Sequence, residues 1–152
     1  MRVFFFVNRV QEIGCRQTTA LLIAAFYRQG HEVFFADVDG LTQPNSDGYK
    51  SDGQAGDSFF TDSVTESPLL VNAIQLQLNT PNVDSQAVSD FVQRIKPTEF
   101  QQYSVTADDL ILIRTNPGRD LERSDKHHTF LELCQIAKAR GIRVVNEPNR
   151  LT

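Results

Sequence analysis

The chain has 152 residues, of which 40% are apolar and 22% are charged. This composition is typical of a globular domain and excludes a disordered, collagen-like or coiled-coil protein, and the length predicts one domain. Fifteen Lys and Arg against nineteen Asp and Glu give a net charge of -4, which argues against a nucleic-acid partner.

The number of cysteines and the length of the apolar runs indicate the cellular compartment of the protein. Cys15 and Cys134 are the two cysteines, too few for a disulfide framework or a four-sulfur metal site. The apolar run 3–7 is too short for a signal peptide, and no later run approaches the roughly 20 residues that cross a bilayer. We therefore expect a soluble, cytoplasmic protein with no membrane partner.

The first third of the chain predicts a strand, a helix and a second strand. Residues 2–7 form a continuous apolar run, as in a strand buried on both faces of a parallel sheet. An apolar helical stripe over 18–29 ends at Gly30, and a second apolar run covers 31–36. This order indicates a right-handed parallel unit.

The middle of the chain carries a weaker signal. Residues 37–68 are rich in Gly, Pro, Asn and Ser and predict an exposed loop. Residues 69–78 fit neither helix nor strand period cleanly, and the turn after them favours a strand. Asp84 is placed to cap an amphipathic helix that runs to about residue 95.

The last third repeats the alternation. Residues 110–113 predict a strand, Ser124 or Asp125 can cap a helix that ends at Gly141, and residues 142–145 predict a final strand. Four short apolar strands separated by helices indicate an α/β fold. We expect a Rossmann-like, open, mostly parallel sheet with helices on both faces.

Ligands of such sheets bind beyond the carboxyl ends of the strands, where loops lead into helices. The first of these loops, 8–19, brings Arg9 and Arg16 close to Thr18 and Thr19 at the start of a helix, a place that favours an anion. Its lone glycine disfavours a dinucleotide fingerprint. The alternative for both threonines is simple helix capping.

The second loop follows the strand 110–113. Arg114 stands at the strand end beside Asn116 and Asp120, which suits bidentate recognition of a carboxylate. The alternative is an ion pair between Arg114 and Asp120 that only shapes the loop. A third loop, 146–149, follows the last strand and contains Asn146.

The remaining reactive side chains suggest little chemistry. His127 and His128 are adjacent on a helix, so they cannot serve one metal as an i, i+4 pair would, and we expect both to be solvated. Cys134 lies on an apolar helix face and is expected to be an inert core residue. Cys15 lies in a loop near two arginines, which would lower the pKa of its thiol, so a nucleophilic Cys15 is a minor alternative hypothesis.

Four blocks of the sequence together resemble a known family. They are VFFFVNRV, RQTTALLIAAFYRQGHEVFFADVDGLT, DDLILIRTNPGRD and ARGIRVVNEPNRLT, which cover roughly residues 2–42 and 108–152. In order and spacing they resemble the N-terminal domain of bacterial glutathione synthetase. The resemblance implies a pre-ATP-grasp domain, that is, a Rossmann-like module that precedes an ATP-grasp domain.

The resemblance also implies an activity and a substrate. Family members join γ-glutamylcysteine and glycine with hydrolysis of ATP, assisted by magnesium. The substrate-facing positions of the family correspond here to Thr18, Thr19 and Arg114, and Asp120 and Asn146 also match. Asn116 is the further binding candidate from the Arg114 loop. The sequence departs from the family at Gln17, where an acidic residue is common, and at residues 115–118, where the family has Lys-Asp-Pro-Pro.

The family's nucleotide-binding segments have no counterpart in these 152 residues. We therefore expect ATP and magnesium to bind an ATP-grasp domain supplied in cis or in trans, and this chain to contribute peptide binding and subunit contacts in a homo-oligomer. On this reading the chain alone has no catalytic residue, no cofactor or metal of its own and no turnover. The alternative is a free-standing, non-catalytic binding or oligomerisation module derived from that domain.

Overall fold

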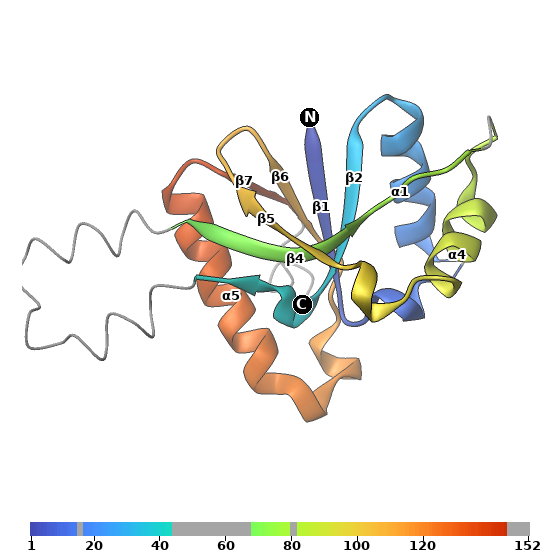
Figure 1. Ribbon diagram of the computed structural model, residues 1–152. Coiled ribbons are helices and arrows are strands. Elements are labelled where there is room, and N and C mark those ends of the chain that lie inside the picture. The colour runs from blue at the N-terminus through green and yellow to red at the C-terminus, as the bar shows by residue number, and fades with distance from the viewer. Residues whose placement is uncertain (15–16, 44–67, 80–81, 146–152) are drawn as a thin grey trace, which may run out of the picture.

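A computed structural model describes residues 1–14, 17–43, 68–79 and 82–145 (Figure 1). Its strands are β1 (Arg2–Val7), β2 (Glu32–Asp37), β3 (Leu41–Thr42), β4 (Leu69–Gln75), β5 (Gln101–Val105), β6 (Leu110–Ile113) and β7 (Arg143–Val145). Its α-helices are α1 (Thr18–Arg28), α4 (Ser85–Gln93) and α5 (Ser124–Ala139). Short 3₁₀ turns are η1 (Val10–Glu12), η2 (Val38–Gly40), η4 (Pro97–Glu99), η5 (Pro117–Arg119) and η6 (Leu121–Arg123).

Four of these strands form the parallel part of the sheet in the order β2, β1, β6, β7. In the central strand β1, Phe5 lies opposite Phe35 of β2 on one side and Leu112 of β6 on the other. A strand flanked on both sides and covered on both faces has to be apolar throughout, as residues 3–7 are. The α/β class predicted from the alternation of strands and helices is confirmed.

The rest of the sheet is antiparallel, which corrects the expectation of a mostly parallel sheet. Strand β4 runs across the front of the parallel strands in Figure 1 and pairs with β2, β3 and β5, each time antiparallel. Its residues 74–75 meet β2, whereas residues 69–73 pair with β5. The result is a mixed, curled sheet. The strand favoured for residues 69–78 is confirmed over residues 69–75, where β4 ends.

The two faces of the sheet are covered by different helices. Val3 and Phe5 of β1 belong to the core on the α1 and α4 side, whereas Phe4 and Phe6 belong to the core under α5. Figure 1 shows α1 and α4 together on one side and α5 on the other. Because successive side chains of a strand point to opposite faces, one uninterrupted apolar strand supplies both cores.

The predicted helix ends are confirmed in part. Asp84 caps α4 by accepting a hydrogen bond from the Ala87 backbone N–H at 2.9 Å. The cap predicted for α5 is wrong, because Ser124 is already the first helical residue and Arg123 stands at the N-cap without a side-chain capping bond. The turn η6 leads directly into α5, so this helix begins without the usual capping residue.

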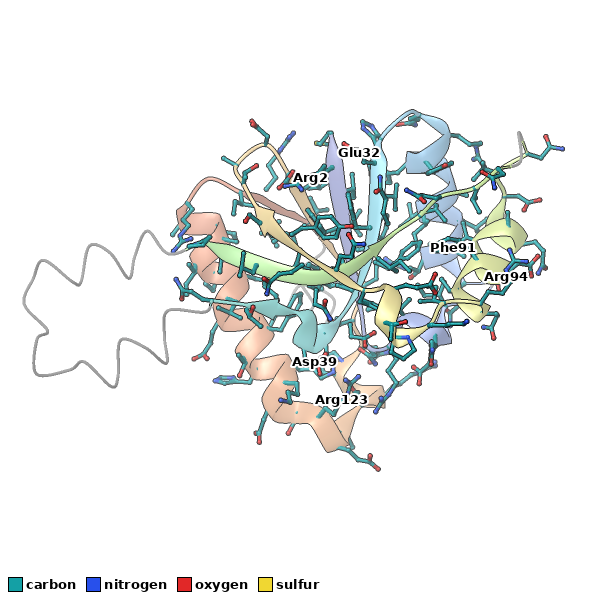
Figure 2. The ribbon with its side chains drawn as sticks, viewed as in Figure 1. Arg2, Glu32, Asp39, Phe91, Arg94 and Arg123 are labelled. Atoms are coloured by element: carbon teal, nitrogen blue, oxygen red, sulfur yellow. The ribbon has the colours of Figure 1, made fainter. Side chains whose placement is uncertain are left out.

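An ion pair secures the amino end of β1, away from the strand ends where ligands bind. Arg2 donates to both carboxylate oxygens of the buried Asp109, at 2.9 and 2.7 Å. Figure 2 shows Arg2 and Glu32 at one end of the molecule and Asp39 and Arg123 at the other. No helix in the described part of the chain is both long and apolar enough to span a membrane.

Candidate functional site

A polar pocket of about 380 Å³ lies at the carboxyl ends of β1 and β6, beside the start of α1. We call it the β1–β6 pocket. Its lining residues are Val7, Asn8, Arg9, Glu12, Ile13, Gln17, Thr18, Thr19, Arg114, Asn116 and Arg119. The structure therefore brings together four of the residues proposed from the sequence, which are Thr18, Thr19, Arg114 and Asn116.

Arg114 connects the end of β6 to the first turn of α1. Its backbone N–H donates to the Phe6 carbonyl at 2.8 Å, which extends the ladder between β1 and β6 by one bond. Its side-chain Nε donates to Thr19 Oγ1 at 3.2 Å. The position of the guanidinium is thus set by one strand and one helix, and the residue forms no ion pair with any described carboxylate.

No side chain among the described residues is seen to cap the start of α1. The N-cap is Gln17, which makes no capping bond and instead accepts a hydrogen bond from the Gly14 N–H at 3.2 Å. Thr18 and Thr19 are the first helical residues, so the capping role considered for them is not observed. Uncapped N–H groups and the helix dipole make this end of α1 favourable for an anion.

Two asparagines join the loops on either side of the pocket. The Asn8 side chain donates through Nδ2 to the Asn116 carbonyl at 2.9 Å and accepts from the Asn116 N–H at 2.8 Å. We call this reciprocal pair the Asn8–Asn116 clamp. It joins residues that are far apart in the sequence, and it holds the turn after β6 against the end of β1.

The charge in the pocket is predominantly positive. Among the described residues, Arg9, Arg114 and Arg119 line it together with one carboxylate, Glu12. Arg9 and Glu12 are 3.8 Å apart and both largely exposed, so this surface pair contributes little energy. Arg114 and Arg119 remain without a carboxylate partner among the described residues. Such a lining suits a carboxylate or a phosphate.

Asp120 lies outside the pocket lining and does not pair with Arg114, so the ion pair considered from the sequence is not observed. Instead it accepts hydrogen bonds from Arg123 Nε at 3.0 Å and from His127 Nε2 at 2.8 Å. Burial favours a raised pKa for Asp120, but the bonds from His127 and Arg123 outweigh it and hold this pKa below its ordinary value.

The two histidines of α5 differ, which corrects the expectation that both are solvated. His128 is exposed and lies 3.5 Å from Glu132, whereas His127 is 3% exposed. His127 precedes Phe130 and Cys134 by three and seven residues, so it shares their buried helix face. That spacing was the signal in the sequence that could have placed it. Cys134 is buried, as expected.

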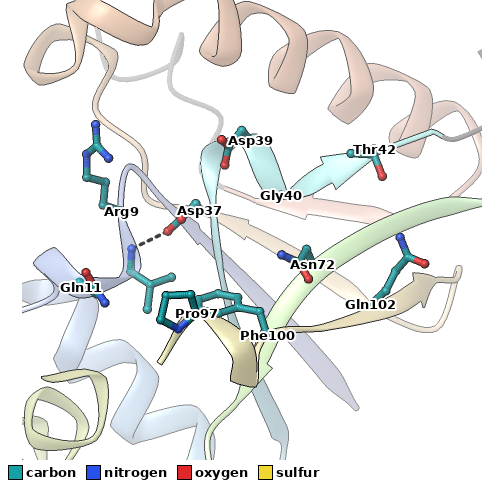
Figure 3. Close-up of a pocket in the computed structure, with 11 residues that line it drawn as sticks. Arg9, Gln11, Asp37, Asp39, Gly40, Thr42, Asn72, Pro97, Phe100 and Gln102 are labelled. Atoms are coloured by element: carbon teal, nitrogen blue, oxygen red, sulfur yellow. Dashed lines mark hydrogen bonds between the residues drawn. The ribbon is translucent and has the colours of Figure 1, made fainter. Parts of the chain in front are cut away.

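A second cavity, of about 530 Å³, lies beyond the end of β2 (Figure 3). Its lining residues are Arg9, Val10, Gln11, Asp37, Asp39, Gly40, Thr42, Asn72, Pro97, Phe100 and Gln102. The carboxylate of Asp37 accepts a hydrogen bond from the Val10 N–H at 2.7 Å, drawn as the dashed line in Figure 3. Burial raises the pKa of Asp37, and the bond from Val10 opposes the rise.

Sequence reasoning missed part of both cavities. Asn8 and Arg119 of the β1–β6 pocket were not singled out, nor was Asp37 at the carboxyl end of β2. The rule that led to Arg114, a polar residue where a parallel strand ends, applies equally to Asn8 and Asp37. Asn146, Cys15 and Arg16 lie outside the described residues.

Among the described residues, no group of three or more His, Cys, Asp and Glu side chains is close enough to hold a metal ion. No model of a known protein family matches this chain, and a search of curated proteins finds no match either. The geometry of the β1–β6 pocket and the resemblance carried by the four sequence blocks are therefore the grounds for a functional assignment.

Proposed function

We propose that this chain is the peptide-binding domain of an ATP-dependent ligase similar to glutathione synthetase, and that the β1–β6 pocket binds a carboxylate of its substrate. The substrate class is a small thiol peptide, γ-glutamylcysteine or glutathione. The observation that carries the proposal is the position of Arg114, which lies against the first turn of α1 without a carboxylate partner among the described residues.

The chemistry of the pocket supports a carboxylate ligand. Thr19 engages the Nε atom of Arg114, and no described residue bonds to the two terminal nitrogens of the guanidinium, which suit a bidentate pair with a carboxylate. The uncapped start of α1 adds N–H donors and a favourable dipole from a second direction. An anion between these two elements would be bound by groups that are already in place, which lowers the entropy cost of binding.

The position of the pocket in the sheet supports the same function. From β1 the chain continues to β2 on one side, and β6 pairs with β1 on the other, so the pocket lies where the strand order reverses. Open α/β sheets bind ligands at such switch points. The Rossmann-like, pre-ATP-grasp relationship is part of the proposal, which rests here on the four parallel strands.

The proposal assigns ATP and magnesium to an ATP-grasp domain in cis or in trans. The residues of this chain then have one task, which is to bind the peptide and orient it towards that domain. Correct orientation alone can contribute a large part of a rate enhancement. No proton transfer or phosphoryl transfer is assigned to the described residues.

Calorimetric titration of the chain with γ-glutamylcysteine and with glutathione tests the proposal. Loss of Arg114 in Arg114→Ala removes a charge-assisted pair, so we expect the Kd to rise roughly 10- to 100-fold. Arg114→Lys keeps the charge but not the two parallel N–H donors of the guanidinium, so we expect its Kd to lie between those of wild type and Arg114→Ala. Arg94→Ala is the matched control, since Arg94 is exposed at the C-cap of α4 and lies outside the β1–β6 pocket.

The outcomes separate the alternatives. Equal affinity of wild type and Arg114→Ala would remove Arg114 from the site. Binding of inorganic phosphate without binding of either peptide would contradict a thiol-peptide substrate and leave a general anion site. Light scattering over a range of concentrations shows independently whether the chain self-associates, as an oligomerisation module should even without ligand.

A further inference from the structure

The side chain of Arg123 forms a hydrogen bond with the backbone of the loop that follows β1, next to the β1–β6 pocket. Its terminal NH2 group donates to the Asn8 carbonyl at 2.5 Å, across 115 positions of sequence. Asn8 is one half of the Asn8–Asn116 clamp, and both halves line the pocket. The side chain of Arg123 therefore acts on the pocket wall from behind without entering the pocket lining.

The side chain of Arg123 is itself held by the buried carboxylate of Asp120, which is held in turn by His127. Its Nε donates to both oxygens of Asp120, at 3.0 and 3.3 Å, and its NH2 group lies 3.0 Å from the same carboxylate. His127 Nε2 contacts the same carboxylate at 2.8 Å. The side chains of Asp120, Arg123 and His127 are 9%, 16% and 4% exposed, so water competes little for these bonds.

The orientation of His127 depends on Asp120. The Nδ1 atom of His127 is buried and has no hydrogen-bond partner among the described residues, so the ring is held by packing and by its Nε2 contact. Its neighbours on the buried face of α5 belong to the core, where Phe130 packs on Phe6 with ring centroids 4.9 Å apart. The network is thus anchored on a rigid helix.

Stability alone is a poor reason to bury this network. Buried ionic groups lose their hydration, and an apolar replacement of similar shape often stabilises a protein as well or better. Here the bonds from His127 through Asp120 to Arg123 lead to one backbone carbonyl beside the pocket, while the NH1 group of Arg123 lies 3.9 Å from Asp39. Binding groups are held in a productive geometry when packing and an outer set of hydrogen bonds fix their positions.

We propose that His127, Asp120 and Arg123 are positioning residues, which hold the Asn8–Asn116 clamp and with it the geometry of the β1–β6 pocket. None of the three lines the pocket, so they act through Asn8 and Asn116. The part of this inference that concerns affinity rests on the proposed function. The part that concerns the clamp does not, because it can be measured without any ligand.

The test compares three variants of α5 residues. His127→Phe keeps a flat ring and removes the donor to Asp120, while His127→Gln keeps a donor that reaches about as far as Nε2. Phe130→Leu is the matched control, since it loosens the same helix face and forms none of the hydrogen bonds of the network. Unfolding temperatures show how much each change costs in stability.

The first readout is the side-chain amide signal of Asn8 in nitrogen-15 NMR spectra, together with its hydrogen-exchange rate. In His127→Phe we expect a shifted signal and faster exchange, in His127→Gln a signal close to wild type, and in Phe130→Leu an unchanged signal despite a lower unfolding temperature. Arg123→Lys, which cannot reach Asp120 and Asn8 together, should also shift the signal.

The second readout is the affinity for γ-glutamylcysteine, which should fall about tenfold in His127→Phe, equivalent to a loss of about 1.4 kcal/mol of binding free energy. An unchanged Asn8 amide in His127→Phe and Arg123→Lys overturns the inference. So does an equal change in Phe130→Leu, which would make the effect one of stability alone. If the wild-type chain binds neither peptide, the proposed function fails while the Asn8 signal still decides this inference.

Discussion

Asp37 ends β2 and Asp120 lies in the turns that follow β6, the two strands that flank β1, yet their pKa values move in opposite directions. Burial raises the pKa of Asp37 because a single N–H bond, from Val10, does not offset the lost hydration. Burial acts in the same sense on Asp120, but bonds from His127 and Arg123 reverse it. Asp120 therefore stabilises the fold above its unfolded pKa of 3.8, and this contribution is lost as the pH falls through its lower folded pKa.

Asp37 makes the opposite contribution, which leads to a prediction. Since the folded state holds a proton on Asp37 more strongly than the unfolded state, stability falls as the pH rises from 3.8 through the raised folded pKa. Asp37→Asn keeps an oxygen acceptor for the Val10 N–H and removes the buried charge. We expect the free energy of unfolding of Asp37→Asn to equal or exceed that of wild type at neutral pH. The difference between the two proteins should become smaller as the pH falls.

Urea unfolding from about pH 4 to about pH 7 measures this dependence. Asp108→Asn is the control, because Asp108 is exposed on the turn between β5 and β6. A loss of stability at neutral pH in Asp37→Asn that exceeds the loss in Asp108→Asn would show that the charge of Asp37 is needed by the fold.

Among the elements, the turn η2 is held unusually close to strand β4. A Cβ atom added to Gly40 would lie 2.9 Å from the Asn72 backbone oxygen and 3.4 Å from Ala36 Cβ. The nearest atom belongs to the backbone of a paired strand, so it cannot move aside without disturbing the sheet. This close approach sets the path of the chain from β2 into β3.

Gly40→Ala should therefore destabilise the protein by about 1–3 kcal/mol, the usual cost of overpacking a filled site. Gly14→Ala is the matched control, since a Cβ there meets no atom within 4 Å. Chemical denaturation of the two variants gives the comparison. If Gly40→Ala and Gly14→Ala were equally stable, η2 could move away from β4 without a loss of stability.

Elements with one dominant apolar pattern could be predicted from the sequence, and the others could not. Residues 2–7 and 110–113 are strands buried on both faces, and their continuous apolar runs predicted them at the observed bounds. β5 was missed because only Tyr103 and Val105 of its five residues are apolar, and its other positions are exposed. The two-residue strand β3 is too short for any period.

For the whole molecule, the decisive feature is that β1 supplies side chains to both cores. Phe5 packs with the α1 and α4 side, and Phe6 packs with the α5 side. Because the two residues are adjacent in one strand, neither core can separate from the other without breaking the ladder on both edges of β1. The two halves should therefore unfold together.

We expect Phe5→Ala and Phe6→Ala each to lower stability by about 3–5 kcal/mol while unfolding stays a single transition. Tyr27 packs against one core and Tyr103 against the other, so their side-chain NMR signals report the two faces separately. When each variant is unfolded with urea, the signals of both tyrosines should disappear at the same urea concentration. Loss of one tyrosine signal at a lower urea concentration than the other would show two independently unfolding layers.

Only part of the candidate site could be predicted from the sequence, as was true of the helices and strands. Arg114 and the start of α1 could be placed at one edge of a sheet because both follow parallel strands, and the structure brings them within hydrogen-bond distance. The Asn8–Asn116 clamp and the bond from Arg123 to Asn8 join residues more than 100 positions apart. No local pattern encodes such pairings.

From residue order alone follow the α/β class, the parallel strands and the arginine at the exit of β6, because local periodicity is produced directly by burial. Folding in three dimensions added the antiparallel half of the sheet, the second cavity beside Asp37 and the burial of His127. The physical reason is that partners across a sheet or behind a loop are chosen by packing and desolvation between distant segments, and these forces leave no period along the chain.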